Sequence, residues 1–224
     1  MVYFRTMNLR KNSWKPHIIS SVIPATEDQA ASIALKMKAE NFIPEIRPDL
    51  TKKMSESGIR KYLDTFAEAG GYGIFTHRSS SKDSIQIFYK IAMEYENLVV
   101  DIDMNHAGFL SGDQRDRSII SSHFTNHTEA EGRIGKIMGM KPGALKLACP
   151  LNTLQFSRIC NFLEGLRLEI PVALIPMGME RQLRVASAIT VSDFAYSYYE
   201  EPVAEGQYST QEFSEIIHII ENGK

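Results

Sequence analysis

The chain has 224 residues, a hydrophobic fraction of 43% and a formal net charge of −2, so it can form one large domain with a sizeable core. The near-neutral charge gives no indication of a nucleic acid as a partner, and no apolar run approaches the length of a membrane span. The N-terminal residues lack the apolar stretch of a signal peptide, and the two cysteines form no CxxC pair, so we expect a cytoplasmic protein.

Short apolar, β-branched runs alternate with longer amphipathic stretches along the chain. We predict eight strands, over residues 17–23, 41–47, 71–78, 97–104, 116–123, 143–148, 171–177 and 189–195. Each run is apolar at both alternating positions for part of its length, which is typical of strands buried on both faces in a parallel sheet. Eight strand–helix units favour an α/β fold of the closed (β/α)₈ type, the TIM barrel, and we treat residues 1–224 as a single domain.

Amphipathic stretches between the strands predict the helices of this barrel. The stretch 26–39 has one apolar face, and so does the stretch 57–69. The segment 128–138 begins with Thr128 and Glu131, which have capping-box spacing. The last predicted helix covers 209–221, with four residues facing inward: Phe213, Ile216, Ile217 and Ile220.

Two segments depart from the regular alternation. The stretch between Met104 and Asp116 is short and contains glycine, so we expect a weak helix or a turn there. Residues 1–16 precede the first strand and have strand-like stretches around a polar cluster at 10–12. We interpret residues 1–16 as a hairpin that could close the bottom of the barrel.

Polar and charged residues gather at the ends of the predicted strands. They are Glu45, Arg47, Asp49, His77, Arg78, Asp101, Asp103, His123, Lys146, Arg184 and Gln207, with Met177 closing the seventh strand. One such residue is usually a solvated rim residue, but in a (β/α)₈ barrel the carboxyl ends of all strands converge on one pocket. His123 and His127 have the i, i+4 spacing of a metal pair, but no HExxH-type carboxylate motif accompanies them, so we predict no metal site.

Lys146 stands out because its neighbours in the sixth strand are small or apolar. A lysine inside a barrel carries a large desolvation cost, and beside other cations it becomes a nucleophilic amine able to form a Schiff base with a ketone. Three arginines, Arg47, Arg78 and Arg184, could bind a carboxylate and hydroxyls, and His123 could move protons. A polyhydroxylated keto acid suits this set of groups.

The order of these motifs resembles that of the type I 3-dehydroquinate dehydratases, through nearly the whole barrel. The matching pieces are EIRPD (45–49), FTHR (75–78), VDIDM (100–104), IISSHF (119–124), LKLACP (145–150), MGMERQLR (177–184) and AEGQYS (204–209). Each piece is short, and the specificity lies in their shared order and spacing.

The resemblance implies dehydration of 3-dehydroquinate to 3-dehydroshikimate, with Lys146 as the imine-forming residue and His123 as general acid and base. It implies substrate binding by Glu45, Arg47, Arg78, Arg184 and Gln207, and it adds Ser21, Asp103 and Met177 as further candidates. No metal or dissociable cofactor is needed. The expected partner is the small-molecule substrate, with neither nucleic acid nor membrane, and a homodimer is compatible with the sequence.

The chain also departs from the family pattern. Lys82 stands where a glutamate usually orients the histidine, and a shift of one residue would make Asp83 the carboxylate instead. Phe124 follows the histidine directly in place of an aspartate, Leu183 replaces a serine, and Val203 stands where a substrate-contacting serine is common.

Two other functions therefore stay open. The first is a non-catalytic relative that binds a similar ligand or a partner, which Lys82 and Val203 favour. The second is another class I Schiff-base lyase or aldolase. An aldolase acting on a sugar phosphate would need a phosphate site near the last two strands, where the sequence has little glycine-rich backbone.

Overall fold

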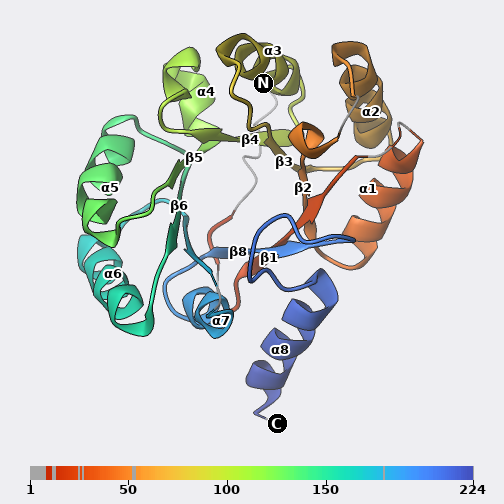
Figure 1. The fold of residues 1–224 in the computed structure, drawn as a ribbon. Coiled ribbons are helices and arrows are strands. Elements are labelled where there is room, and N and C mark those ends of the chain that lie inside the picture. The colour runs from red at the N-terminus through yellow and green to blue at the C-terminus, as the bar shows by residue number, and fades with distance from the viewer. Residues whose placement is uncertain are drawn as a thin grey trace.

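A computed structural model describes residues 9–11, 14–24, 26, 28–51, 54–178 and 180–223. Its centre is a parallel sheet of eight strands in the order β7-β6-β5-β4-β3-β2-β1-β8. The strands are β1 (His17–Val22), β2 (Ile43–Ile46), β3 (Gly73–Thr76), β4 (Leu98–Asp103), β5 (Ser118–His123), β6 (Ala144–Pro150), β7 (Val172–Met177) and β8 (Phe194–Tyr198). Figure 1 shows the helices as a ring around this sheet, so the chain is the (β/α)₈ barrel that the sequence predicts.

Eight α-helices are found in the described residues. They are α1 (Gln29–Ala39), α2 (Glu56–Glu68), α3 (Lys82–Met93), α4 (Gly112–Asp116), α5 (Ala130–Gly139), α6 (Thr153–Leu166), α7 (Gln182–Ile189) and α8 (Thr210–Asn222). Short 3₁₀ turns lie at Pro48–Leu50, Ala107–Phe109 and His127–Glu129. No helix of the described chain has the length and apolar character needed to cross a membrane.

The barrel closes between β7 and β8 through one backbone hydrogen bond and two side-chain acceptors. Within the described residues these two strands share no ladder. Instead, the N–H of Asp193 donates to the carbonyl of Val172 at 2.7 Å, and the Asp193 carboxylate accepts from the N–H of Val172 at 2.9 Å. The hydroxyl of Ser192 accepts from the N–H of Leu174 at 3.0 Å. Polar residues just before β8 thus satisfy the backbone groups of its neighbour.

The eighth strand is the one that the sequence analysis misplaced. The other seven strands differ from their predicted ranges by at most two residues at either end, but β8 begins at Phe194, not at residue 189. The β-branched run from Ile189 to Val191 belongs to the end of α7 and the turn after it. The N–H of Thr190 donates to Ala186 and that of Val191 donates to Ser187, which are helical hydrogen bonds.

Most helix predictions are confirmed, with local corrections. As predicted, the segment after Met104 forms no long helix, but a 3₁₀ turn at Ala107–Phe109 and the five-residue α4. The predicted capping box of Thr128 and Glu131 is wrong, because Asn126 caps the preceding turn and α5 begins at Ala130 without a side-chain cap. Ile220 was predicted to face inward but is 40% exposed. Residues 1–8, 12 and 13 lie outside the described residues, so most of the predicted hairpin over 1–16 lies outside them too.

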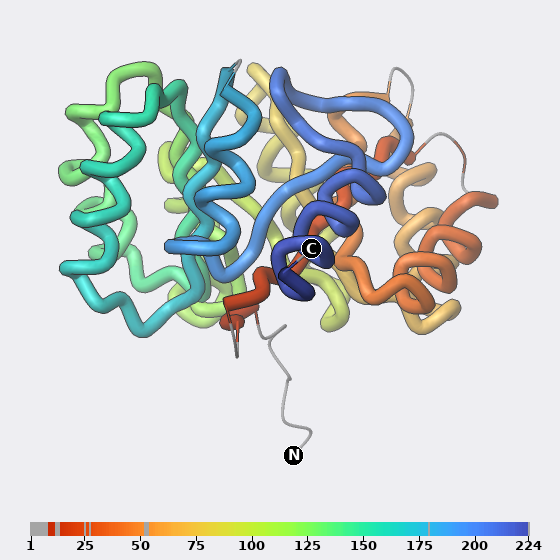
Figure 2. The backbone as a smooth tube through the Cα atoms, turned by 90° about the horizontal axis from the view of Figure 1, so that it is seen from below, coloured from red at the N-terminus to blue at the C-terminus, as the bar shows by residue number. Residues whose placement is uncertain are grey.

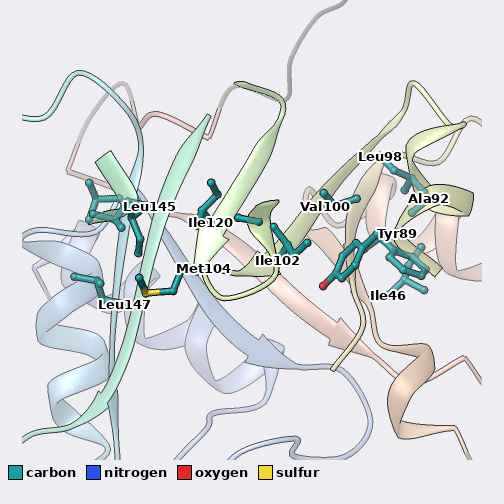
Figure 3. Close-up of a cluster of buried hydrophobic side chains, with 14 of the residues drawn as sticks. Ile46, Tyr89, Ala92, Leu98, Val100, Ile102, Met104, Ile120, Leu145 and Leu147 are labelled. Carbon is teal, nitrogen blue, oxygen red and sulfur yellow. The ribbon is translucent and has the colours of Figure 1, made fainter. Parts of the chain in front are cut away.

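Alternation along the strands separates two cores. Outward-facing strand residues pack against the helices, and Figure 3 shows part of this layer, with Ile120 of β5 between Val100 and Ile102 of β4 and Leu145 and Leu147 of β6. Inward-facing residues near the strand starts form a second apolar cluster inside the barrel: Leu9, Ile19, Ile43, Ile74, Val99, Ile119, Ala144, Ala173, Phe194 and Tyr196. This cluster packs the interior of the barrel near the strand starts.

The two ends of the barrel differ accordingly. Figure 2 shows the barrel from the side, with the start of the described chain at the lower end and the connection from β8 to α8 at the upper end. Along β4 and β6 the next inward positions after Val99 and Ala144 are Asp101 and Lys146. Along these two strands, the inward-facing side chains therefore change from apolar to charged over two residues.

Candidate active site

A cavity of about 290 Å³ lies at the carboxyl ends of the strands. Its lining residues are Ser21, Glu45, Arg47, Thr76, Arg78, His123, Lys146, Ala148, Ile175, Met177, Arg184, Tyr196, Val203, Ala204 and Gln207. Of the site residues predicted from the sequence, all of which are described, Asp103 alone is not in the lining. The structure thus brings nine of the ten predicted residues to one cavity, which is where a (β/α)₈ barrel binds its ligands.

Lys146 lies in the middle of β6, between the outward-facing Leu145 and Leu147. Its side chain turns into the barrel and the residue is 5% exposed. The ammonium nitrogen is 2.5 Å from the Oδ2 of Asp101 and 3.6 Å from the Oε1 of Glu45. It also lies 3.7 Å from the centre of the Tyr196 ring, whose face attracts a cation. The interior amine is therefore matched by two carboxylates and an aromatic ring.

Asp101 is fully buried and links Lys146 to Arg78. Its Oδ1 accepts a hydrogen bond from Arg78 at 2.8 Å, and the same Arg78 nitrogen donates to the hydroxyl of Ser121 at 2.8 Å. Burial would raise the pKa of Asp101, but the charges of Lys146 and Arg78 outweigh burial and hold the pKa well below its usual range. Asp101 is therefore an anion with a cation on each oxygen.

Glu45 is the second buried carboxylate of the cavity. Its two oxygens accept hydrogen bonds from Ser21 at 2.6 Å and from Thr76 at 2.8 Å. Burial would raise the pKa of Glu45, and the charges of Lys146 and Arg47 lower it overall. Each oxygen thus has a fixed donor, which holds the carboxylate in place.

Arg47 and Arg78 carry the positive charge at the rim of the cavity. Arg47 makes a two-pronged ion pair with Asp49, at 3.0 and 2.7 Å, which fixes its guanidinium plane. Within the described chain, the Nη1 of Arg78 is buried without an acceptor. A ligand oxygen in the cavity could provide the acceptor that this nitrogen lacks.

Arg184 of α7 and Gln207, which lies in the connection from β8 to α8, line another part of the cavity. Arg184 donates to the carbonyl of Glu205 at 2.9 Å, and the side-chain oxygen of Gln207 accepts from the N–H of Val203 at 3.0 Å. Burial and the neighbouring Arg181 lower the pKa of Arg184 to about 10. The Nε of Arg184 is buried and finds no acceptor in the described residues. This guanidinium, which is positively charged at neutral pH, can therefore still donate a hydrogen bond to an anion.

His123 ends β5 at the cavity rim, with a side chain that is 44% exposed. A carboxylate lies beside it: the Oδ2 of Asp103 in β4 is 3.9 Å from the imidazole Nδ1. Lys82 and Asp83, the two residues considered for this place from the sequence, are exposed in the first turn of α3. The carboxylate beside the histidine therefore comes from the neighbouring strand.

From the sequence, the surroundings of Lys146 were predicted wrongly and two further residues of the site were missed. We expected Lys146 to lie among cations, which is wrong: its nearest charged neighbours are Asp101 and Glu45. Asp101 was noted at a strand end but given no role, although the alternation of β4 places it on the same face as Asp103. Tyr196 was missed because the eighth strand was predicted to end before it.

Within the part of the chain that the structure describes, no group of three or more His, Cys, Asp or Glu side chains is arranged to hold a metal ion. Cys149 and Cys160 are both buried and free. Burial raises the pKa of the Cys149 thiol to about 12, so this thiol is protonated at neutral pH and unsuited to nucleophilic attack.

Fold and site together define a (β/α)₈ barrel with a buried lysine, paired with carboxylates, in the cavity at the carboxyl ends of its strands. No family model matches the chain. A 3-dehydroquinate dehydratase from Thermoplasma acidophilum is 27% identical over 178 residues, which cover 77% of this chain and 75% of that protein. The 3-dehydroquinate dehydratase of Thermoplasma volcanium is 27% identical over 199 residues, 83% of each chain.

Solved structures show the same fold. A 3-dehydroquinate dehydratase from Geobacillus kaustophilus matches with a TM-score of 0.78 at 15% identity, over 96% of this chain and 99% of that chain. A type I 3-dehydroquinate dehydratase from Clostridium difficile matches with a TM-score of 0.74 at 17% identity, over 94% of each. The chain is thus similar to 3-dehydroquinate dehydratases in sequence and has their barrel.

Proposed function

We propose that this protein is a 3-dehydroquinate dehydratase of type I, which forms a Schiff base between Lys146 and the substrate ketone. The observation that carries the proposal is the position of the Lys146 amine, inside the barrel and at the lining of a cavity that also holds His123. The similarity to the Thermoplasma dehydratases supports the reaction, and the lysine supports the Schiff-base class.

The charges of the cavity suit a hydroxylated keto acid. Arg184 and Gln207 are proposed to bind the substrate carboxylate, since the buried Nε of Arg184 lacks an acceptor among the described residues. Arg47, Arg78 and Glu45 also line the cavity and are proposed to bind the ring hydroxyls. Together, these contacts would hold the ketone over Lys146 in a reactive geometry.

In the proposed mechanism, the neutral amine of Lys146 attacks the ketone carbon, and the carbonyl oxygen leaves as water to give an iminium. The iminium withdraws electrons from the adjacent carbon, so His123 can remove a proton there as general base. The electron pair then moves to expel the β-hydroxyl, which leaves as water after accepting the proton from His123. Hydrolysis of the conjugated iminium releases the enone and restores the amine.

Asp101 has a clear part in this scheme. The Oδ2 of Asp101 lies 2.5 Å from the resting ammonium of Lys146 and fixes the position of that nitrogen. The iminium then carries its positive charge at the same nitrogen. The carboxylate that faced the ammonium therefore faces the iminium without rearrangement, which is the preorganised electrostatics that lowers a barrier.

The test is direct. Purified protein with 3-dehydroquinate should produce the ultraviolet absorbance of the conjugated enone of 3-dehydroshikimate, and the Lys146→Met variant should not. Protein that binds 3-dehydroquinate in a calorimeter without producing this absorbance would instead be the non-catalytic relative, which Val203 in the cavity lining favours. If the protein neither binds 3-dehydroquinate nor turns it over, the proposal is wrong.

A further inference from the structure

The proposed acid–base residue has a feature that the proposed function does not explain. His123 sits at the rim with 44% of its side chain exposed, and a general base needs one nitrogen unprotonated and aimed at the substrate. A neutral imidazole has two tautomers, and a hydrogen bond at one nitrogen decides which of them is present. Some group must therefore select the tautomer of His123.

Asp103 is placed to do this. Its Oδ1 accepts two hydrogen bonds from Asn105, one from the backbone N–H and one from the side-chain amide, both at 2.9 Å. These bonds fix the carboxylate and occupy one oxygen. The other oxygen, Oδ2, faces the Nδ1 of His123 at 3.9 Å. Unliganded enzymes often hold such contacts long and shorten them when substrate binds.

The barrel itself sets this pairing. β4 and β5 are parallel neighbours, with Asp103 opposite Ser121. His123 is two residues further along β5, on the same face of the strand as Ser121. The two side chains therefore meet because of strand register, and the pairing does not depend on a loop.

We propose that Asp103 is the positioning residue of His123, and that its carboxylate binds the Nδ1–H and leaves Nε2 as the basic nitrogen toward the cavity. The inference rests on the proposed function for its catalytic meaning, but the contact itself can be tested without turnover. Asp103, and neither Lys82 nor Asp83, is then the residue beside the imidazole of His123.

Electrostatics agree with this pairing. Burial would raise the pKa of Asp103, but the nearby imidazole of His123 and the hydrogen bond from the backbone of Asn105 outweigh burial and lower it. Arg78, on the adjacent strand end, lowers it further. Arg78 lines the cavity together with His123, and so do the cations Arg47, Lys146 and Arg184 and the anion Glu45.

The first experiment is nitrogen NMR of the imidazole in uniformly labelled protein, at a pH where His123 is neutral. In the wild-type protein the Nδ1–H tautomer should dominate. Asp103→Asn should return the ring to a mixture of both tautomers, whereas Asp83→Asn, the matched control in the exposed first turn of α3, should leave it unchanged. An unchanged tautomer ratio in Asp103→Asn would overturn the inference whether or not the protein is a dehydratase.

The second experiment is steady-state kinetics with 3-dehydroquinate. Asp103→Asn should lower kcat by about 10–100-fold, with KM within about threefold of the wild-type value, because a group that orients a catalytic residue acts on the chemical step. Asp103→Glu should recover part of the loss. An effect on KM alone, or a kcat equal to that of the wild type, contradicts the proposal.

Asn105→Ala guards against an Asp103 variant that fails to fold. It keeps the carboxylate and removes only the side-chain amide bond to Oδ1. It should shift the tautomer ratio and kcat in the same directions as Asp103→Asn, by a smaller factor. Normal behaviour of Asn105→Ala, with a misfolded Asp103→Asn, would mean that Asp103 serves the fold and not the histidine.

Discussion

The ammonium nitrogen of Lys146 lies 2.5 Å from the Oδ2 of Asp101, and both side chains are inside the barrel. A buried ion pair of this kind makes each partner dependent on the other, because removing one leaves an uncompensated charge in a poorly solvated place. The same pairing sets the amine at a fixed point of the cavity. Stability and the proposed chemistry are thus linked at this pair of residues.

The first prediction concerns stability. Lys146→Met removes the cation and leaves Asp101 and Glu45 facing each other, so the free energy of unfolding should fall by about 3–5 kcal/mol. The double variant Lys146→Met, Asp101→Asn removes one of the two facing negative charges, keeps a side-chain oxygen that can accept from Arg78, and should recover part of this loss. Urea unfolding of the three proteins measures both changes. A double variant that is less stable than Lys146→Met would contradict the account of the pair.

The second prediction concerns acid unfolding. The folded-state pKa values of Asp101 and Glu45 are lowered, by Lys146 together with the nearby arginines, against the opposing effect of burial. A carboxyl with a lowered folded pKa stabilises the fold above its unfolded pKa, about 3.9 for aspartate, and this stabilisation is lost as the pH falls toward the folded pKa. The unfolding free energy should therefore fall steeply below about pH 4.

Asp101→Asn tests this by slope. Removing one carboxyl whose folded pKa is lowered should reduce the slope of unfolding free energy below about pH 4, by at most about 1.4 kcal/mol per pH unit, one proton's worth. The comparison of slopes holds even if Asp101→Asn is less stable throughout. Asp83→Asn, in the exposed first turn of α3, should keep the wild-type slope. Equal slopes in all three proteins would be inconsistent with an ionised Asp101.

The third prediction separates two neighbouring arginines. Arg184 is buried beside the cavity, whereas Arg181 is 43% exposed and pairs with Glu212 at 3.5 Å. Arg184→Ala should raise KM by about 10–100-fold, because a charge-assisted hydrogen bond contributes about 1.5–3 kcal/mol. Arg181→Ala should change KM by less than about threefold. A larger effect at Arg181 would show that the substrate carboxylate binds elsewhere.

The fourth prediction concerns the connection from β8 to α8. Gly206 has a φ of +71°, and a Cβ there would lie 2.4 Å from the carbonyl oxygen of Gly178. Gly206→Ala should displace this connection and raise KM, since Val203 and Gln207 line the cavity from it. Gly70→Ala is the matched control, because Gly70 has a φ of +72° with no atom within 4 Å. Both variants carry the backbone strain, about 1–2 kcal/mol, but only Gly206→Ala should affect KM.

Much of the barrel could be predicted because its strands carry two signals at once. Val100 and Ile102 alternate with Asp101 and Asp103, so hydrophobic runs mark the strands and the interspersed charges mark the interior. Lys146 between Leu145 and Leu147 is the same signal in β6. Strand ends converge in this fold, so the charged positions could be assigned to one cavity before any coordinates were known.

What could not be predicted depends on register and on local competition. The run Ile189–Val191 has the composition of a strand, but the N–H groups after Ile189 donate hydrogen bonds back to α7. Because the eighth strand was therefore predicted too early, Tyr196 was not predicted to lie in the site. In the sequence, the partner of His123 was expected near Lys82, where type I 3-dehydroquinate dehydratases usually have a glutamate. It comes from β4, and only the pairing of β4 with β5 shows that Asp103 lies beside it.

The central claim is that Lys146 forms the Schiff base. Mass spectrometry after borohydride reduction in the presence of 3-dehydroquinate tests it most directly, because reduction turns a transient imine into a stable amine. The account predicts a ligand-sized mass increase on a peptide that contains Lys146, absent without substrate and absent from Lys146→Met. An adduct on Lys136 or Lys141 instead, or no adduct in protein that turns over 3-dehydroquinate, would contradict it.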